Sequence, residues 1–345
     1  MNDDALHVEA LHLLEHVRGA GEGMVGADAA RWLDTIARKH DRVDAALHYF
    51  VARGRGAEAV TLMAEVWRYW LTRGDTREGR EWLASALTAS GADTPSGARA
   101  RALYGAGLLA FRQDDNETAR RLNEESLAVA RAVGDRAATV EALGGLARVA
   151  LREGDYVAAR ARCEDGLALA RAGGKRGAEV LPLHLLAAIT RIEGDYDGAR
   201  RLYLASVQLN KALGDARMVA MEHVNLGSVE VLAGNPEGAE PHLRDGLRAV
   251  RALGAQGILA VCLIGLACVA AARGDVARAA RLLGATEADL ARTETALDPD
   301  DQPLYDAAVV QARAAMGEEA FAAARAAGRE LALEAAAAYA LDEGP

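Results

Sequence analysis

Three residues near the amino terminus have types and a spacing that could bind a metal. His12, Glu15 and His16 follow the pattern H-x-x-E-H, which on a helix can place two imidazoles and a carboxylate around one zinc ion. A zinc peptidase of this kind also needs a further ligand far downstream and an α/β domain around it, and neither is visible. We therefore interpret the three residues as a polar stripe on an exposed helix and keep them as a secondary metal candidate.

Two glycine-rich stretches could in principle approach a phosphate. Residues 21–26 follow G-x-G-x-x-G, and a poorer match covers residues 54–59. A dinucleotide site needs a strand before the glycines and a helix after them, whereas a helix is predicted before residue 21. No G-x-x-x-x-G-K-[ST] motif occurs either. We expect no nucleotide site at these positions.

The cysteines do not indicate catalysis. Cys262 and Cys268 are six residues apart, which places them about 240° apart around a helix and prevents them from chelating one metal easily. With Cys163, they are predicted to be free thiols in the core of a protein from a reducing cytoplasm. No Ser–His–Asp set or pair of converging carboxylates is recognisable. We expect no cofactor and favour a non-enzymatic role.

The composition narrows the class of partner. The chain has 345 residues, of which 51% are hydrophobic and 4% aromatic, and a formal net charge of -10. An acidic balance argues against direct nucleic-acid binding, which needs a concentrated basic face. The amino terminus has no basic, then apolar, signal sequence, and no apolar run is long enough to span a membrane. We expect a soluble, cytoplasmic protein.

The element that must position any site is a repeat of 40 residues. Turn signals recur with this step, at Gly74-Asp75, Asp114-Asp115, Gly154-Asp155, Gly194-Asp195, Gly234-Asn235 and Gly274-Asp275. A second series with the same step lies between them, at Gly134-Asp135, Gly174-Lys175, Gly214-Asp215 and Gly254-Ala255. The two series divide the chain into helical hairpins joined by tight turns.

Columns of equivalent residues support the repeat. The first helices share a leucine column at 103, 143, 183 and 263, with His223 as the exception, and a second one at 146, 186, 226 and 266. A small-residue column follows at 107, 147, 187, 227 and 267, and the second helices share alanines at 119, 159, 199, 239 and 279. Such columns predict that each hairpin packs against the next, because one hairpin cannot bury both faces alone.

The predicted fold is therefore all-α: a right-handed superhelical solenoid of about six hairpins with helical caps. We place an amino-terminal cap at residues 1–55, with two or three helices interrupted by a flexible stretch at 19–23. The repeats follow at 56–95, 96–135, 136–175, 176–215, 216–255 and 256–295. The carboxyl-terminal cap, 296–345, starts with the acidic loop 298–303 and continues with helices near 303–316 and 318–341.

The order of small, leucine and alanine columns resembles the tetratricopeptide repeat. The 40-residue form is similar to the sensor solenoid of the maltose-regulon activator and of large actinobacterial LuxR-type and SARP-type regulators. Three parts of the chain carry this resemblance: residues 31–34 with 45–47, residues 66–70 with 78–83, and residues 279–285 with 317–321. The resemblance implies sensing of a ligand or partner. It does not extend to ATP hydrolysis or DNA binding, because the phosphate loop and the DNA-reading helix-turn-helix are missing.

The resemblance also implies which residues face a ligand groove, since these positions are set relative to the small-residue column. The arginine-rich and aromatic part of the set contains Arg68, Arg101, Tyr104, Phe111, Arg148, Arg152, His184 and Arg191. The more apolar part contains Met221, His223, Asn225 and Ile264. Arginine forks suit carboxylates or phosphates, and aromatic rings supply stacking faces. The alternative is that these arginines pair with solvent and with Glu141 and serve only solubility.

Three functions follow from these observations. The first is a regulatory scaffold or sensor that binds a protein, a peptide or an amphipathic anionic small molecule in the groove. The second is a sensor fragment of a larger transcriptional regulator whose ATPase and DNA-binding parts lie elsewhere. The third is an enzyme or an antibiotic-sequestering protein that uses the groove. A homodimer is compatible with all three.

Overall fold

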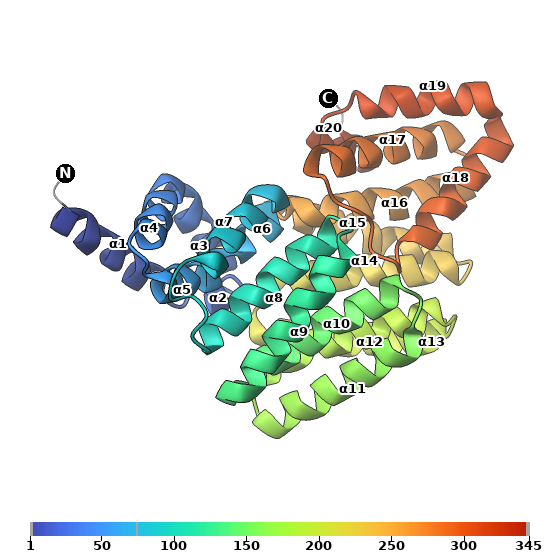
Figure 1. Ribbon diagram of the computed structural model, residues 1–345. Coiled ribbons are helices and arrows are strands. Elements are labelled where there is room, and N and C mark those ends of the chain that lie inside the picture. Colours follow the sequence, from blue (N-terminus) through green and yellow to red (C-terminus); the bar gives the residue numbers. More distant parts are fainter. Residues whose placement is uncertain (1–2, 74, 343–345) are drawn as a thin grey trace. The chain divides into compact units, whose positions relative to one another are not determined.

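The computed structural model describes residues 3–73 and 75–342, and throughout these ranges every regular element is a helix (Figure 1). The predicted all-α class is confirmed. None of the helices in the described ranges is long and apolar enough to cross a membrane. The chain divides into two compact units, which are treated separately below. The first unit comprises Met1–Leu185 and Leu213–Asp215, and the second comprises Leu186–Ala212 and Ala216–Pro345.

The helices of the first unit begin with four that precede the repeats. These are α1 (Asp3–Val17), α2 (Ala20–Gly23), α3 (Ala29–Arg38) and α4 (His40–Ala52). The repeat helices of this unit are α5 (Gly56–Val66), α6 (Arg68–Arg73), α7 (Thr76–Thr88), α8 (Gly97–Arg112), α9 (Asn116–Val133), α10 (Arg136–Arg152), α11 (Tyr156–Gly173) and the short 3-10 helix η1 (Arg176–Glu179). Residues 20–23 of the stretch expected to be flexible form α2, and Gly19 precedes this helix as its N-cap. Figure 1 shows α8 to α11 as neighbouring antiparallel helices.

The division between the units falls inside α12 (Val180–Ile192), within the repeat array. The repeat helices that follow are α13 (Tyr196–Leu213), α14 (Ala216–Leu232), α15 (Pro236–Ala252), α16 (Gln256–Ala272) and α17 (Val276–Thr293). The remaining ones are α18 (Gln302–Met316), α19 (Glu318–Arg329) and α20 (Leu333–Ala340). The single helix predicted over 318–341 is thus two helices, because Ala332 is extended with ψ 146° and turns the chain back. As a result α20 contacts α16 and α17.

The recurring glycine–aspartate pair acts at the junction between two helices. Gly154 has a φ of 77°, a left-handed conformation that costs glycine little and ends a helix. Asp155 then accepts a hydrogen bond of 3.0 Å from the amide of Ala158 and so caps the next helix. Asp114 occupies the glycine position of an earlier turn, with a φ of 62°. Gly74 lies outside the described residues.

The predicted packing columns are confirmed by their burial. The alanines at 119, 159, 199, 239 and 279 are all 0% exposed. In the small-residue column, a Cβ added to Gly107 would lie 2.5 Å from the Asn123 side chain. One added to Gly227 would lie equally close to Leu243. Real Cβ atoms do not approach so closely, so these positions admit nothing larger than glycine without repacking.

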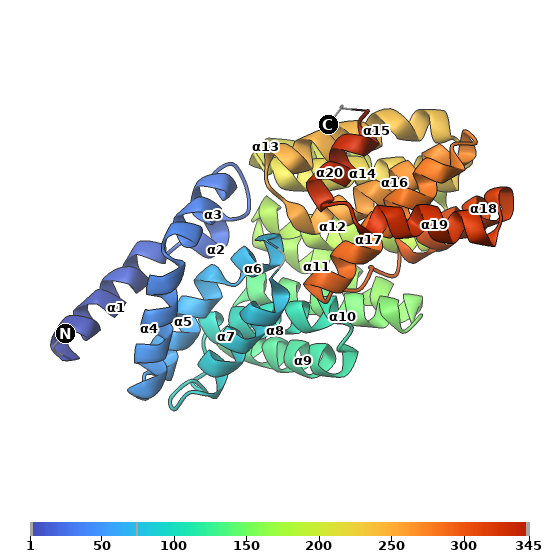
Figure 2. The ribbon, with the colours of Figure 1, turned by 90° about the horizontal axis from the view of Figure 1, so that it is seen from above.

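The carboxyl-terminal helices pack backbone to backbone on the last repeat. A Cβ at Gly284 in α17 would lie 2.0 Å from the carbonyl oxygen of Arg325 in α19. One at Gly328 would lie 2.0 Å from the carbonyl oxygen of Arg281. Figure 2 shows α17, α18 and α19 side by side. Glu287 of α17 stabilises the contact between α17 and α19, because its carboxylate accepts hydrogen bonds from Arg325 at 2.7 and 2.8 Å.

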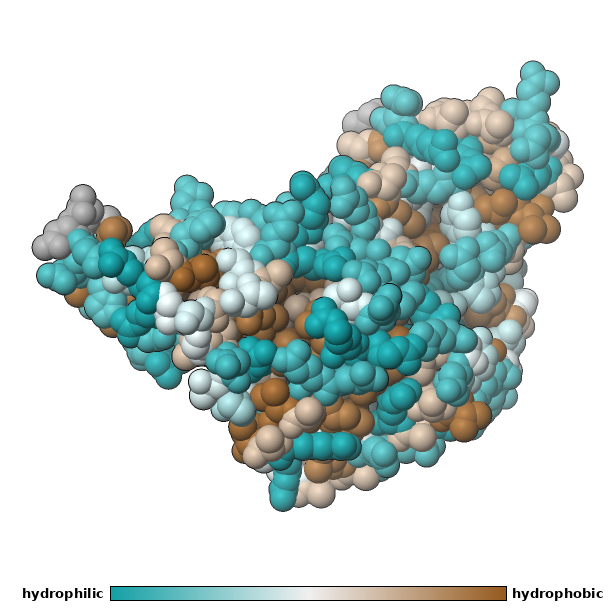
Figure 3. Space-filling model, in the orientation of Figure 1, coloured by the Kyte–Doolittle hydropathy of each residue, from teal (hydrophilic) through white to brown (hydrophobic). Residues whose placement is uncertain are grey.

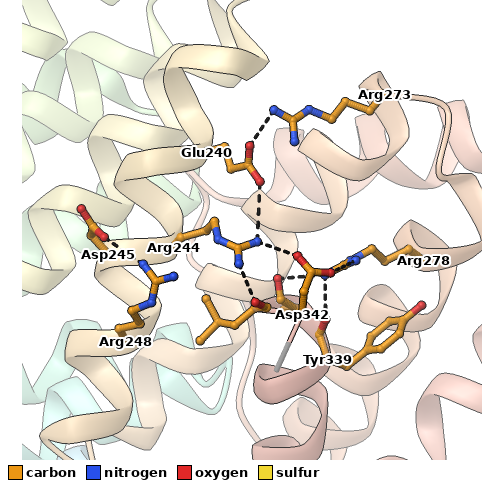
Figure 4. A network of polar contacts seen from close by, with 10 residues as sticks. Glu240, Arg244, Asp245, Arg248, Arg273, Arg278, Tyr339 and Asp342 are labelled. Atoms are coloured by element: carbon orange, nitrogen blue, oxygen red, sulfur yellow. Dashed lines mark hydrogen bonds and ion pairs between the residues drawn. The ribbon is translucent and has the colours of Figure 1, made fainter. Parts of the chain in front are cut away.

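The end of α20 is held by arginines of α15 and α17 (Figure 4). Arg244 forms an ion pair of 3.0 Å with Asp342, and Arg278 forms a second ion pair with the same carboxylate. Arg278 also donates a hydrogen bond of 2.7 Å to the carbonyl oxygen of Tyr339. The hydrogen bonds from Arg278 and Arg244 lower the pKa of Asp342. The last described residues are therefore anchored to the repeats of the second unit.

Candidate functional site

The predicted groove residues of the first unit form a cluster on α6, α8 and α10. We call it the Arg148 face and define it by Arg68, Arg101, Tyr104, Glu141 and Arg148. Arg68 donates a hydrogen bond of 2.5 Å to Glu141, and each of these two side chains is 22% exposed. Arg101, 40% exposed, forms an ion pair of 3.2 Å with Asp135. Burial raises the pKa of Glu141, and the positive charges of Arg68 and Arg101 oppose this rise.

Tyr104 lies beneath the charged groups of the Arg148 face. It is 3% exposed and makes an edge contact with Trp67, with ring centroids 5.6 Å apart. Burial and the Glu141 carboxylate raise its pKa, while Arg148 and Arg68 lower it. Arg148 itself is half-buried, and its Nε has no hydrogen-bond partner among the described residues. No carboxylate in the described part of the chain pairs with Arg148, which makes it the cation of this face best suited to an incoming anion.

Phe111 and Arg152, both predicted to face a ligand, contact each other. Phe111 is 2% exposed, and the guanidinium carbon of Arg152 lies 3.8 Å from the centroid of its ring. Arg152 also donates hydrogen bonds to the carbonyl oxygen of Phe111 at 3.0 Å and to Asp114 at 2.8 Å. The aromatic ring therefore has an intramolecular partner and no open stacking face. His184 is half-buried on α12.

The predicted groove residues of the second unit differ in their surroundings. Ile264 is 0% exposed and belongs to the hydrophobic core, so the expectation that it lines an open groove does not match its position. Met221 is partly buried against the same core. His223 is half-buried, and its Nδ1 lies 3.2 Å from the Nδ1 of His242, with the two rings stacked. Burial, followed by the charge of His242, lowers the pKa of His223.

Asn225 is part of a buried polar network that the sequence analysis did not find. It donates a hydrogen bond of 2.9 Å to Glu222, which is 0% exposed. Ser206 donates another of 2.6 Å to the other carboxylate oxygen. The available signal was Glu222, which lies among the apolar residues 218–221, 224 and 226 and therefore demands hydrogen-bond partners when it is buried.

Arg191 is the most buried of the predicted cations, with 2% exposure. Its Nη2 forms an ion pair of 3.0 Å with Asp301 and a second ion pair with Asp300. These aspartates belong to the acidic loop before α18, so the loop and α12 meet within the second unit. Both partners are recognisable in the sequence, Arg191 as a groove residue and the aspartates as part of an acidic loop, but no sequence pattern connects them. We call Arg191, Asp300, Asp301 and the adjoining Tyr203 the Arg191 site.

A separate cavity of about 450 Å³ lies in the first unit, where α10 begins and α11 ends. Its lining contains the charged residues Asp135, Arg136 and Lys175. Asp135 already has two partners. Its carboxylate caps α10 by accepting a hydrogen bond from the amide of Ala138, and it forms an ion pair with Arg101. The predicted groove residues do not line this cavity.

The H-x-x-E-H residues, the glycine-rich stretch at 21–26 and the three cysteines lie outside the Arg148 face and the Arg191 site. His12, Glu15 and His16 are exposed on α1, and Glu15 pairs with Arg18 at 3.0 Å. Within the described ranges, no group of three or more His, Cys, Asp and Glu side chains is arranged to hold a metal ion. The glycines of residues 21–26 follow α1, a helix, as predicted. All three cysteines are free and buried, and burial raises the pKa of Cys163 and of Cys268 to about 12.

The surface in Figure 3 is mostly hydrophilic, with hydrophobic patches between the charged side chains. Val157, at the start of α11, is the most exposed of the large hydrophobic residues, at 83%. Isolated exposed side chains of this kind are usual in soluble proteins and do not by themselves mark a site.

Comparisons with known proteins agree with this architecture. Residues 98–172 match the tetratricopeptide repeat family model. The structure of a Rap protein complexed with competence and sporulation factor has a TM-score of 0.59 and 14% identity, covering 85% of this chain and 78% of that one. NprR in complex with its cognate peptide NprX has a TM-score of 0.54 and 17% identity, covering 76% and 74%.

The Rap conjugation gene regulator of plasmid pLS20, in complex with the Phr* peptide, has a TM-score of 0.53 and 13% identity, covering 77% of this chain and 78% of that one. No curated protein sequence matches the chain. At these identities the likeness concerns the fold. The chain is thus a helical repeat protein, of which residues 98–172 match the tetratricopeptide repeat and whose fold is similar to that of these three structures.

Proposed function

We propose that this chain is a non-catalytic repeat scaffold that binds a peptide or protein segment and has a regulatory role. The observation that carries the proposal is the Arg148 face, where a half-buried arginine, which pairs with no carboxylate of the described residues, lies beside a buried tyrosine. Desolvated arginines bind carboxylates strongly, because the planar fork can donate two parallel hydrogen bonds. The structures with a similar fold include two proteins in complex with peptides, which supports a peptide as the ligand here.

The chemistry of the Arg148 face favours a ligand with an acidic group. Arg68 and Arg101 already share the carboxylates of Glu141 and Asp135, so they contribute less net charge than Arg148. Trp67 lies under Arg68, whose guanidinium carbon is 4.4 Å from its ring centroid. A ligand at this face would therefore meet a flat guanidinium layer backed by aromatic rings. An amphipathic anionic small molecule would use the same contacts.

The proposal is tested by selecting a peptide library on the immobilised protein and measuring each enriched peptide by fluorescence anisotropy. We expect enrichment of peptides with aspartate or glutamate, and at least a tenfold weaker binding to Arg148→Gln. Arg121→Gln is the matched control, because Arg121 is an exposed arginine of α9, and it should bind like the wild type. Equal binding by Arg148→Gln, or no enrichment, would overturn the proposal.

A second candidate is the sensor part of a larger transcriptional regulator. It is favoured by the resemblance to regulators of the LuxR and SARP types, which is carried by residues 31–34 with 45–47, 66–70 with 78–83, and 279–285 with 317–321. The genomic sequence around the coding region tests this candidate. A phosphate-binding loop or a helix-turn-helix in the same reading frame or in an adjacent gene would support this candidate. Adjacent coding sequences without either motif would contradict it.

A further inference from the structure

The acidic loop of the second unit lies on the face of the repeats as a bound peptide would. Residues 295–301 form no helix, and the side chains of residues 295–300 are half-buried (the orange coil between α17 and α18 in Figure 1). Leu297 packs against the core before the aspartates, and Leu304 is 0% exposed after them. Cys268 of α16 donates a hydrogen bond of 3.3 Å to the carbonyl oxygen of Leu304. The segment 297–304 is therefore anchored by two leucines and, between them, by Asp300 and Asp301.

The anchoring cation belongs to the first helix of a repeat. Arg191 lies on α12, at the column position that Phe111 and Leu151 occupy in earlier repeats. A charged guanidinium at an otherwise apolar and buried position is costly unless carboxylates compensate it. The only acidic side chains that pair with Arg191 in the described residues are Asp300 and Asp301. The loop thus supplies the negative charge that this position requires.

The resident loop uses only part of the guanidinium. All three hydrogen bonds to the loop come from Nη2, which donates to the carbonyl oxygen of Asp300 at 2.8 Å, to its carboxylate, and to Asp301 at 3.0 Å. The Nε and Nη1 atoms of Arg191 are buried and have no hydrogen-bond partner among the described residues. A carboxylate approaching the edge formed by Nε and Nη2 would make two parallel hydrogen bonds, which is the stronger geometry, and it would compete with the loop for Nη2.

Tyr203 and Asp301 influence the electrostatics around Arg191. Tyr203 of α13 is 0% exposed and interacts electrostatically with Arg191, Asp300 and Asp301. Two neighbouring carboxylates on one arginine repel each other, and burial together with Asp300 raises the pKa of Asp301 to about 7. Burial beside Asp300 therefore disfavours the charged form of Asp301.

From these contacts we infer that the Arg191 site is a binding site for acidic peptide segments, and that residues 297–304 are its resident, displaceable ligand. This inference rests on the proposed function, since it assigns a second peptide site to the same scaffold. The ligand class is a segment with an aspartate or glutamate pair that has a leucine three residues before the first acid and three residues after the second. A partner peptide with this pattern would compete with the chain's own loop.

The experiment uses the full chain and a synthetic, fluorescently labelled peptide with the sequence of residues 297–306. The double variant Asp300→Asn/Asp301→Asn weakens the resident loop and keeps amide oxygens beside Arg191. We expect this variant to bind the peptide at least tenfold more tightly than the wild type. A peptide with asparagine at both aspartates should bind at least tenfold more weakly, and Arg191→Gln added to the double variant should remove the tight binding. Equal affinity of wild type and double variant, or of both peptides, would overturn the inference.

A second measurement remains decisive if the double variant does not fold. Hydrogen exchange of the wild type is followed with and without unlabelled peptide at millimolar concentration, which is on the order of the effective concentration of a tethered loop. Faster exchange of amides 295–304 with peptide is expected, and unchanged exchange would contradict displacement. Library peptides could still bind in an Arg148-dependent way when neither tighter binding by the double variant nor faster exchange of amides 295–304 is seen. That result would overturn this inference alone and leave the proposed function intact.

Discussion

The guanidinium carbon of Arg152 lies 3.8 Å from the centroid of the Phe111 ring, and its Nη1 donates to the carbonyl oxygen of the same residue. The two residues come from the first helices of successive repeats. They are 41 positions apart, which is one repeat of 40 residues plus one residue. Their contact therefore joins one repeat to the next. It also shows that a residue in a column predicted to face a ligand can contribute to packing between repeats.

This contact gives a first prediction about stability. Arg152→Ala removes both the stacking on Phe111 and two hydrogen bonds, and we expect a loss of about 1–2 kcal/mol in the free energy of unfolding. Urea denaturation followed by circular dichroism measures it. The exposed Arg121→Ala should change stability by less than about 0.5 kcal/mol. Equal effects of the two substitutions would contradict a structural role for Arg152.

A second prediction concerns the close contact of α17 and α19. Gly284→Ala places a Cβ against the backbone of Arg325, which cannot move as a flexible side chain would. We expect a loss of about 1–3 kcal/mol, the usual cost of overpacking. Gly177→Ala is the control, because a Cβ there meets nothing within 4 Å. It should be neutral or slightly stabilising, and a Gly284→Ala protein as stable as this control would contradict the packing described here.

The third prediction is a pH dependence caused by Asp301. Its pKa in the folded protein is raised to about 7 from an ordinary value of 3.8, so the folded state holds this proton more tightly than the unfolded chain does. The stabilisation is complete below pH 3.8 and is lost as the pH rises through about 7. The slope cannot exceed about 1.4 kcal/mol per pH unit for one proton.

Several charged or titratable groups face Asp301 and must be kept unchanged in this test. They are Arg191 of α12, Tyr203 of α13, Cys262 of α16, and Asp298 and Asp300 of the loop itself. Urea unfolding at pH 5, 6, 7 and 8 should show that wild type loses stability relative to Asp301→Asn as the pH rises. A difference that does not vary with pH would show that Asp301 has an ordinary pKa.

His223 gives a fourth prediction, with the opposite sign. Burial and His242 lower its pKa below the ordinary 6.5, so the unfolded chain takes up this proton more readily than the folded protein. The stabilisation from neutral His223 is present above pH 6.5 and is lost as the pH falls through the lowered value. In two-dimensional NMR, His223 should titrate below 6.5 in wild type and at a higher pH in His242→Gln. An unchanged midpoint would exclude coupling between the two rings.

The fifth prediction is that the folded protein does not expose reactive thiols. Cys163, Cys262 and Cys268 are all buried, and burial raises the pKa of each. Because the thiolate is the reactive form, a disulfide reagent such as Ellman's reagent should label no cysteine at pH 8 in buffer and three per chain in denaturant. Rapid labelling of the native protein would show that at least one of these helices opens readily.

The repeat architecture could be predicted from sequence because its determinants are local and periodic. Gly154 and Asp155 specify a helix end and the next helix start by their own backbone and side-chain chemistry. The alanine column at 119, 159, 199, 239 and 279 reports a contact that every repeat makes. Neither inference requires knowledge of contacts between distant parts of the chain.

The site was harder to predict because its contacts are distant in sequence. Arg191 and Asp301 are 110 positions apart, and no periodic signal connects a repeat column with a loop in the cap. Ile264 fits the groove column, but it is fully buried in the hydrophobic core of the second unit. A position in the repeat predicts which face of its helix a residue lies on. It does not predict which helix or loop from another part of the chain covers that face.

The crossing of α17 and α19 also restricts how this array could change in length during evolution. A further repeat added after α17 would have to occupy the surface that α19 takes at Gly284 and Gly328, where two backbones touch without an intervening side chain. Duplication of a 40-residue unit is therefore compatible with the interior of the array, where a buried alanine recurs at 119, 159, 199, 239 and 279, and incompatible with its carboxyl-terminal border.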